Sequence, residues 1–428
     1  LFIINKSKVY YYMKKEKIYI GDLAYKEAGS AFPLGAGYMA SMISFYFKKS
    51  IETKIFRDPE KLVKAIKEDP PNIVALANYS WNRNINSQVI NYSKKISKNI
   101  ISIFGGPCFA KNDKQWLDQF FKKNDSLDFY ISGEGEWKFI QLIKQARKYS
   151  YSVKKIRDKV SPDVFFKTEA GEITQGTIPL HEVLDHRYED TIKKNSNLDI
   201  IQSPYLSGQL DEFFEIDDMV PMIETVRGCP YACTFCCWGD PSLSRLSAFS
   251  EERVYAELDY IVKRSKKNFG KLILADGNFG ILKRDVELAK YLNKLNSKYG
   301  WPKNIYLYFA KNSNDRIVEI ASLLGKMVKI SLARQTENED VLKNIKRKNI
   351  NEETFHKIQK QLAASNIDSM VEFIYPLPGE TRETFMEGMN NLFKKIDIMH
   401  TEIRFYPTEL LPGSEMATTE SRKKFVIF

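Results

Sequence analysis

Three cysteines in a single turn have the clearest capacity for chemistry: Cys229, Cys233 and Cys236, spaced C-x3-C-x2-C. Three thiolates in one loop can hold three corners of a cubane iron–sulfur cluster, whereas a closed cluster of that kind takes four cysteines. One iron would then have no protein ligand. Because an iron with open coordination positions can bind and act on a small molecule, the spacing indicates a catalytic rather than a structural site.

Two other interpretations of these thiols are a structural zinc site, with Cys237 as the fourth ligand, and a chance group of buried cysteines. Adjacent Cys236 and Cys237 are awkward for tetrahedral zinc, and zinc sites usually pair two distant knuckles, whereas this chain has one such loop. The cluster is the favoured interpretation.

The loop resembles that of the radical S-adenosylmethionine (SAM) superfamily, which reads C-x3-C-x-aromatic-C; the aromatic residue here is Phe235. In that family the open iron is chelated by the amino and carboxylate groups of SAM, and one electron from the cluster cleaves SAM to a 5'-deoxyadenosyl radical. The resemblance implies a [4Fe-4S] cluster, with Cys229, Cys233 and Cys236 as its metal ligands and catalytic residues. It also implies that Phe235 packs near the adenine of SAM.

Length and composition bound the rest of the chain. Its 428 residues predict two or three domains, and 43% hydrophobic with 13% aromatic residues indicate packed cores rather than disorder. The net charge of +11 comes from lysines spread along the chain and interleaved with Asp and Glu, which favours a solvated surface. We therefore expect no nucleic-acid partner.

Cysteine usage and apolar runs indicate the compartment. Four of the five cysteines lie between 229 and 237, so they do not form a disulfide framework, and a reducing cytoplasm fits. No apolar run is long enough to span a bilayer, and Leu1–Ile4 is too short for a signal peptide. We expect no membrane partner. The first residue is not Met, which suggests a clipped sequence.

The elements that must position the loop form two α/β units, the first over residues 17–150 after a tail at 1–16. Short apolar runs alternate with helical stretches, and the expected strands lie at 18–20, 52–56, 73–77, 100–104 and 128–131. Strands that are near-continuous apolar runs between helices predict a Rossmann-like, doubly wound parallel sheet. Such sheets bind ligands at the carboxyl ends of their strands, where this unit has glycines, although glycine loops are also ordinary turns.

A unit of this kind just ahead of the cysteine loop resembles the cobalamin (B12)-binding class of radical SAM enzymes, over about residues 17–415. The resemblance implies that its loops surround the corrin and nucleotide tail. The implied contacts are Leu34, Gly35, Tyr38, Asn78, Ser80, Gly105, Gly106, Pro107, Gly133, Glu134 and Gly135. The D-x-H-x-x-G cobalt-ligating motif of other cobalamin enzymes is absent, and none of the four histidines, His181, His186, His356 and His400, lies in this unit.

Residues 151–220 lose the alternation and predict a polar linker with a hairpin at 164–167 and 171–174. The segments 201–206 and 210–214 resemble the bridging segment of cobalamin enzymes. His181 and His186 are interpreted as surface or packing residues because no cysteine or carboxylate group accompanies them.

Residues 221–415 predict six β/α units, with strands at 223–226, 271–275, 305–309, 328–332, 370–375 and 402–406. Six units suit the open, partial (β/α)6 TIM-like barrel of radical SAM enzymes, whose catalytic residues lie at the strand ends. The resemblance implies that Asp276 and Asn278 contact the amino group of SAM, and that Ser331, Arg334 and Gln335 contact its carboxylate or ribose. Residues 416–428 are expected to be a tail, where related enzymes often continue into a further domain.

Together the resemblances imply a cobalamin-dependent radical SAM enzyme, first of all a methyltransferase that methylates an unactivated carbon or phosphorus centre through methylcobalamin. Expected partners are a small-molecule or biosynthetic-intermediate substrate and an external electron donor of the flavodoxin or ferredoxin type. Radical cyclisation or rearrangement without methyl transfer, and a non-catalytic iron–sulfur and cobalamin-binding protein, stay open. RNA modification is less favoured, since the chain has no recognisable RNA-binding appendage.

Overall fold

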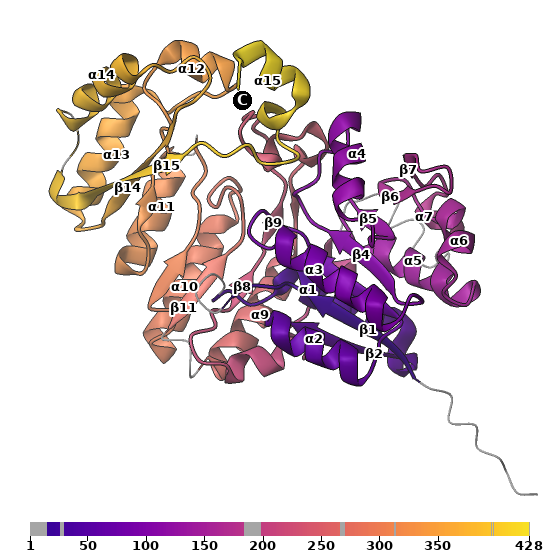
Figure 1. The fold of residues 1–428 in the computed structure, drawn as a ribbon. Coiled ribbons are helices and arrows are strands. Elements are labelled where there is room, and N and C mark those ends of the chain that lie inside the picture. Colours follow the sequence, from indigo (N-terminus) through magenta and orange to yellow (C-terminus); the bar gives the residue numbers. More distant parts are fainter. Residues whose placement is uncertain are drawn as a thin grey trace, which may run out of the picture.

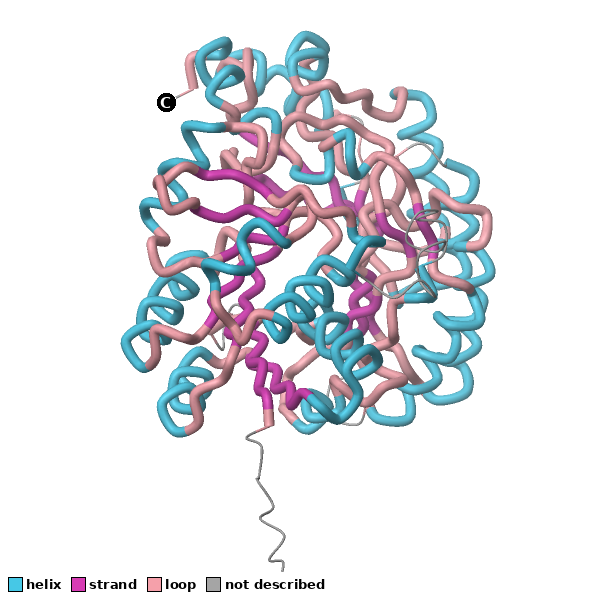
Figure 2. The backbone as a smooth tube through the Cα atoms, turned by 90° about the vertical axis from the view of Figure 1, so that its right-hand side faces the viewer, coloured by secondary structure: helices cyan, strands magenta, loops and turns pink. Residues whose placement is uncertain are grey.

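The computed structural model of the chain describes residues 15–25, 30–183, 198–265, 270–311, 314–394, 396 and 398–427. A seven-stranded sheet with helices on both faces forms one side of the molecule, and an arc of short strands with helices outside it forms the other (Figure 1). Figure 2 shows the two sets of strands from the side, surrounded by helices. The predicted fold class, a doubly wound sheet followed by a partial barrel, is confirmed.

The first sheet has the strand order β2-β1-β3-β4-β5-β6-β7, and its first five strands are parallel. These five are β1 Glu16–Gly21, β2 Ile51–Phe56, β3 Ile73–Ala77, β4 Ile101–Gly105 and β5 Phe129–Ile131. The helices between and after them are α1 Leu34–Phe47, α2 Pro59–Glu68, α3 Arg83–Ile96, α4 Lys114–Lys123 and α5 Glu136–Lys148.

Alternate side chains of these strands belong to two different cores. Ile18 and Ile20 pack on the face covered by α1 and α5, while Tyr19 packs on the face covered by α2, α3 and α4. The period of two along each strand places neighbouring side chains on opposite faces. The α1–α5 core continues without a break into the second half of the molecule, where it includes Ile223 and Leu272. The two halves are therefore joined by apolar packing.

The hairpin predicted within the linker belongs to the first sheet. Its strands β6 Val164–Lys167 and β7 Ile173–Gln175 are antiparallel and extend the sheet beyond β5. Phe165 and Phe166 explain this, because each is buried in the core of a different face. The first unit thus reaches past residue 150, with short helices α6 Val153–Ile156 and α7 Leu180–Val183 beside it. His181 lies in α7, and His186 lies outside the described residues.

The segment before the second unit is packed rather than polar, which corrects the prediction of a polar linker. Tyr205 is fully buried, and its hydroxyl donates to the Met222 carbonyl oxygen at 2.7 Å. Phe32, ahead of α1, packs against the rings of Tyr205, Phe213 and Phe214. Aromatic packing therefore fixes this connection between the two halves.

The second unit contains six parallel strands in two sheets of three, in the orders β12-β11-β8 and β13-β14-β15. The strands are β8 Met222–Ile223, β11 Lys271–Leu274, β12 Asn304–Tyr306, β13 Ile330–Ser331, β14 Ser369–Tyr375 and β15 Thr401–Pro407. The helices are α9 Glu251–Arg264, α10 Asp285–Tyr299, α11 Asn314–Leu324, α12 Glu339–Asn344, α13 Glu352–Ala364, α14 Arg382–Phe393 and α15 Thr419–Phe425.

The first barrel strand is shorter than the predicted 223–226. β8 ends at Ile223, and a separate strand β9 Val226–Arg227 pairs antiparallel with β10 Ser247–Ala248. The break arises because the backbone N–H groups of Thr225 and Val226 donate to the Asp276 carboxylate, at 2.7 and 3.1 Å, instead of to a strand. The chain is thereby turned toward the cysteine loop.

The remaining elements are short 3-10 helices: η1 Lys48–Ser50, η2 Arg157–Lys159, η4 Leu198–Ile200, η5 Asp211–Glu215, η6 Cys237–Gly239, η7 Pro241–Leu243, η8 Gly325–Met327, η9 Ile398–His400 and η10 Glu415–Ala417. Within the described ranges, no helix combines the length and apolar character needed to cross a membrane.

Candidate active site

The cysteine loop runs from the end of β9 to η6 and is fixed by its backbone. Gly228 has φ +95°, and a Cβ there would lie 2.1 Å from the Arg245 carbonyl oxygen, so only glycine fits. Cys229 N–H donates to the Leu243 carbonyl oxygen at 2.8 Å. Thr234 N–H donates to the Ile345 carbonyl oxygen at 3.1 Å, which ties the loop to the end of α12.

Hydrogen-bond donors surround the sulfurs of this loop. Cys229 and Cys233 are 9% and 4% exposed, and Cys236 is partly buried. Asn278 Nδ2 lies 3.1 Å from Cys229 Sγ, while Lys311 Nζ lies 3.5 Å from Cys233 Sγ. A neutral thiol is a weak acceptor, so donors and a cation directed at buried sulfurs fit thiolate ligands. The arrangement fits the three-cysteine cluster predicted from the sequence.

Arg347 is the second cation here, with Nη1 4.0 Å from Cys233 Sγ. Burial lowers the pKa of both Lys311 and Arg347, while the Cys233 sulfur acts in the opposite direction. The sequence gives no sign that either residue belongs to the site. Lys311 is one of 65 Lys and Arg residues, and Arg347 lies in the basic run Lys346–Lys348, which resembles a solvated surface.

Cys237 is directed away from this group. Its thiol donates to the Pro412 carbonyl oxygen at 3.5 Å, and burial raises its pKa to about 12. Across the described ranges, no three His, Cys, Asp or Glu side chains converge on one metal-ion position. The corners of a cubane belong to different irons, so cluster ligands need not converge in this way, whereas zinc ligands must.

Asp276 and Asn278, which follow β11, have different surroundings. The buried Asp276 carboxylate accepts the N–H groups of Thr225 and Val226 and also the Thr225 hydroxyl. Burial raises its pKa to about 7, although those hydrogen bonds act to lower it. Asn278 Oδ1 is buried and has no hydrogen-bond partner among the described residues. Asn278 therefore has an acceptor to offer a ligand, whereas Asp276 holds the strand that leads to Cys229.

The three predicted SAM contacts in and after β13, which are Ser331, Arg334 and Gln335, also have different surroundings. Gln335 is buried at φ +69°, and its Oε1 has no partner in the described parts of the chain. Ser331 Oγ donates to Glu372 Oε2 at 2.8 Å, and Tyr406 OH is 3.2 Å from Glu372 Oε1. A left-handed backbone at a non-glycine residue is typical of functional sites. Gln335 and Asn278 thus share the property of a buried, unpartnered amide oxygen.

Arg334 is engaged elsewhere. Its Nε donates to Glu337 Oε1 at 2.7 Å, its Nη1 donates to the Ile350 carbonyl oxygen at 2.9 Å, and its guanidinium lies 4.9 Å from the ring centroid of Phe355 in α13. Phe235 packs against a small hydrophobic core formed by Val341, Leu342, Ile345 and Leu377. The contacts of Arg334 and Phe235 with SAM stay predictions.

The predicted cobalamin residues lie at the carboxyl ends of the first sheet or in α1. Leu34, Tyr38 and Asn78 are buried. Ser80, Gly105, Gly106 and Gly135 are half-buried, while Gly35, Pro107, Gly133 and Glu134 are exposed. A Cβ on Gly35 would meet no atom within 4 Å, whereas one on Gly106 would lie 2.8 Å from the Asn78 carbonyl oxygen. Gly106 is thus required by the protein's own backbone, and Gly35 faces open space that a ligand can approach.

Tyr38 belongs to the interface between the two halves. Its ring stacks on Phe249 with centroids 6.0 Å apart, and the Arg227 guanidinium lies 5.3 Å from its centroid. Its hydroxyl is buried and has no partner in the described ranges, and burial raises its pKa well above the ordinary value.

Arg227 joins the cysteine loop to the first sheet. Its guanidinium pairs with Glu136 at 2.7 Å, at the start of α5, and with Glu224 at 2.9 Å. The three side chains are between 6% and 14% exposed. Gly413 makes a second junction, since a Cβ there would lie 2.9 Å from the Pro107 carbonyl oxygen. The structure therefore brings the loops after β4 and β5 to the cysteine loop.

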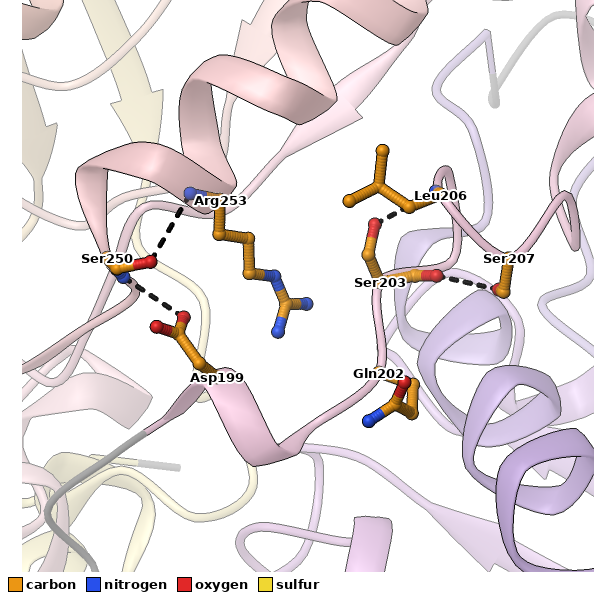
Figure 3. A pocket seen from close by; sticks show the side chains of 7 residues that line it. All are labelled: Asp199, Gln202, Ser203, Leu206, Ser207, Ser250 and Arg253. Atoms are coloured by element: carbon orange, nitrogen blue, oxygen red, sulfur yellow. Dashed lines mark hydrogen bonds between the residues drawn. The ribbon is translucent and has the colours of Figure 1, made fainter.

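A separate pocket of about 430 Å³ lies between the start of α9 and the connection around residue 203 (Figure 3). Its lining residues are Asp199, Gln202, Ser203, Leu206, Ser207, Ser250 and Arg253. Ser250 accepts the N–H of Arg253, and its own N–H donates to Asp199 at 3.0 Å. None of the predicted site residues lines this pocket. We therefore place the candidate active site at the cysteine loop and not in this pocket.

Comparison with known proteins agrees with this location. Residues 223–392 match the radical SAM superfamily. The chain is 30% identical over 383 residues to the cobalamin-dependent radical SAM methyltransferase TokK of Streptomyces tokunonensis, covering 86% of this chain and 52% of TokK. It is also 30% identical over 378 residues to 2-(S-pantetheinyl)-carbapenam-3-carboxylate methyltransferase of Streptantibioticus cattleyicolor, covering 85% of this chain and 51% of that protein. The chain therefore spans about half the length of these relatives.

Solved structures share the fold. The radical SAM methyltransferase TsrM of Kitasatospora setae superimposes with a TM-score of 0.69 at 13% identity, covering 94% of this chain and 75% of TsrM. The cobalamin-dependent radical enzyme OxsB gives a TM-score of 0.63 at 17% identity, covering 96% of this chain and 56% of OxsB. Residues 223–392 thus belong to the radical SAM superfamily, and over 86% of its length the chain is similar to a cobalamin-dependent radical SAM methyltransferase.

Proposed function

We propose that this chain carries the catalytic core of a cobalamin-dependent radical SAM methyltransferase that acts on an unactivated carbon, or alternatively phosphorus, centre of a small molecule. The observation that carries the proposal is the junction between the two halves. There a three-cysteine loop with donors directed at its sulfurs lies against the loop ends of a Rossmann-like sheet. Cofactor enzymes of this kind depend on the protein to place two reactive groups opposite one substrate.

In this proposal Cys229, Cys233 and Cys236 hold a [4Fe-4S] cluster, and the open oxygens of Asn278 and Gln335 accept hydrogen bonds from SAM. When bound, the cluster supplies the electron that cleaves SAM to a 5'-deoxyadenosyl radical, and cobalamin carries the methyl group to the substrate. Asp276 holds the strand end that presents Cys229. Burial of Cys229 and Cys233 limits the access of water to two of the three sulfurs.

The sheet loops hold cobalamin, with Gly35 and the loop after β4 offering backbone that a ligand can approach closely. Each domain would hold its own cofactors. The first, over 17–150 and extended by the hairpin to 175, would bind cobalamin, and the second, over 221–415, would bind the cluster and SAM. An external donor of the flavodoxin or ferredoxin type supplies electrons, and a small-molecule or biosynthetic-intermediate substrate enters at the open barrel.

Anaerobic reconstitution with iron, sulfide and hydroxocobalamin tests the proposal. After desalting, we expect about four irons and one cobalt per chain, with the visible spectrum of both cofactors. Retention of iron without cobalt would be consistent with a radical SAM protein but would contradict the proposed cobalamin-dependent methyltransferase. With candidate substrates, methyl transfer gives S-adenosylhomocysteine together with 5'-deoxyadenosine, whereas 5'-deoxyadenosine alone would indicate rearrangement.

A further inference from the structure

Two cations lie against one of the three proposed cluster ligands. Lys311 Nζ is 3.5 Å from the Cys233 sulfur, and Arg347 Nη1 approaches the same sulfur at 4.0 Å. The Cys229 sulfur instead receives a neutral amide, that of Asn278, at 3.1 Å. Positive charge is therefore concentrated near the Cys233 sulfur.

Neither cation is in an ion pair with a carboxylate in the described parts of the chain. Arg347 is buried, and its other donors reach neutral acceptors, the Ala333 carbonyl oxygen and the Asn349 side chain. The Lys311 ammonium lies 5.0 Å from the ring centroid of Tyr231. A buried cation without an anion is costly. Cysteine thiolates and the cluster bound to them would provide the missing negative charge.

We propose that Lys311 and Arg347 raise the reduction potential of the cluster, so that a flavodoxin- or ferredoxin-type donor can reduce it. The inference rests on the proposed function. Three thiolates leave a cubane with a net negative charge, and one electron from the donor, with no proton, makes that charge more negative. Fixed positive charge and hydrogen bonds at a ligating sulfur stabilise the more negative state.

Lys311→Met tests this directly, because it removes the charge and keeps the length of the side chain. The Lys311 ammonium contacts the Cys233 sulfur and the Tyr231 ring, and neither contact holds the loop backbone. We would titrate the reconstituted full chain anaerobically without SAM and follow the reduced cluster by electron paramagnetic resonance. At the wild-type midpoint, we expect the ratio of reduced to oxidised cluster to fall about tenfold, a shift of about 59 mV for one electron.

A charge-conserving variant and a variant at an exposed lysine separate the effect of charge at the sulfur from other effects. Lys311→Arg should keep a potential near wild type, and Arg347→Met should shift it in the same direction as Lys311→Met. Lys346→Met removes the same charge at an exposed neighbour that pairs with Glu415 at 2.6 Å, and it should leave the potential unchanged. Iron content is measured for every variant, so that loss of the cluster is not mistaken for a shift.

The outcomes are distinct. An unchanged potential in Lys311→Met with full iron content would overturn the inference. The same holds if the only change is weaker SAM binding, which would indicate that the two cations bind the SAM carboxylate instead. If the wild-type chain assembles no cluster, the proposed function fails first, and the inference fails with it.

Discussion

The two sets of loops that meet at the centre of the molecule are built differently. The loop after β4 is shaped by backbone: Gly106, at φ +130°, lies against the main chain of Asn78. The cysteine loop is also constrained by its backbone at Gly228, but in addition its sulfurs are approached by side chains from separate elements, namely Asn278, Lys311 and Arg347. A loop that is shaped by its backbone can be recognised in the sequence by its glycines, but the glycines do not identify its ligand. In a site assembled from separate strand ends, only the cysteine motif can be recognised in the sequence, and the other residues of the site cannot.

The largest expected effect comes from the cysteines. Replacing Cys229, Cys233 or Cys236 by Ala should abolish SAM cleavage and greatly reduce bound iron, because each replacement removes one of the three proposed cluster ligands. The measurement is iron content and 5'-deoxyadenosine formation after reconstitution. Cys237→Ser is the matched control: its thiol donates to the Pro412 carbonyl oxygen, so iron and cleavage should persist. Loss of metal in Cys237→Ser would favour a four-cysteine zinc site instead.

Arg227→Met should have the next largest effect, since it leaves Glu136 and Glu224 buried without their cation. Breaking a buried pair by removing one partner typically costs about 3–5 kcal/mol. Urea unfolding of the cofactor-free chain measures the loss, and cobalt retention shows whether the halves still meet. Glu136→Gln in the same chain should recover part of the stability, because it removes one uncompensated charge. Equal stability of Arg227→Met and wild type would mean that apolar packing alone joins the halves.

Asp276 predicts a pH dependence. Burial raises its pKa to about 7, while the unfolded value is about 3.9. Between these values the folded chain holds a proton that the unfolded chain has released. The contribution of this carboxyl to stability is therefore complete below about pH 4 and lost as the pH rises through about 7, by at most about 4 kcal/mol.

Asp276→Asn provides the measurement, since its amide oxygen can accept the two backbone N–H groups and cannot ionise. The free energy of unfolding of this variant, relative to that of the wild type, should be higher at about pH 8 than at about pH 5, as measured by urea unfolding. A difference that is the same at both pH values would show that the buried carboxyl does not titrate in this range.

Much of the fold could be predicted because local and periodic signals agree. The five parallel strands of the first sheet and the six of the barrel follow from apolar runs, and α2 begins at an Asp-Pro pair, with Asp58 as its N-cap. The hairpin was predicted but not its place, since pairing with β5 depends on which faces of the sheet Phe165 and Phe166 cover. That is a property of the folded sheet rather than of the segment.

The site was predictable only where residues are close in sequence. The cysteine spacing is local, so the sequence shows it. Lys311 and Arg347 lie 78 and 114 residues from Cys233, and each resembles an ordinary surface cation until the barrel brings them together. The sequence also does not show that the Asp276 carboxylate accepts hydrogen bonds from the backbone N–H groups of Thr225 and Val226. No local pattern indicates that a carboxylate takes the place of a neighbouring strand.

Gly106→Ala tests the backbone-shaped loop. The positive φ and a Cβ 2.8 Å from the Asn78 carbonyl oxygen should destabilise the chain by about 2–3 kcal/mol, because neither backbone segment can yield. Urea unfolding without cofactors measures the change. A neutral result would mean that the loop can rearrange and that its shape is not set by its own backbone.

Gly35→Ala should have the smallest effect on stability and the most specific effect on binding. Gly35 is exposed in the first turn of α1, and a Cβ there meets no protein atom within 4 Å. Alanine should therefore stabilise the cofactor-free chain slightly, by about 0.4–1 kcal/mol. If cobalamin lies against this backbone, the added methyl group should lower cobalt retention after reconstitution while iron content stays at the wild-type level. Unchanged cobalt retention would place the corrin away from α1 and leave the loops after β3, β4 and β5 as its binding surface.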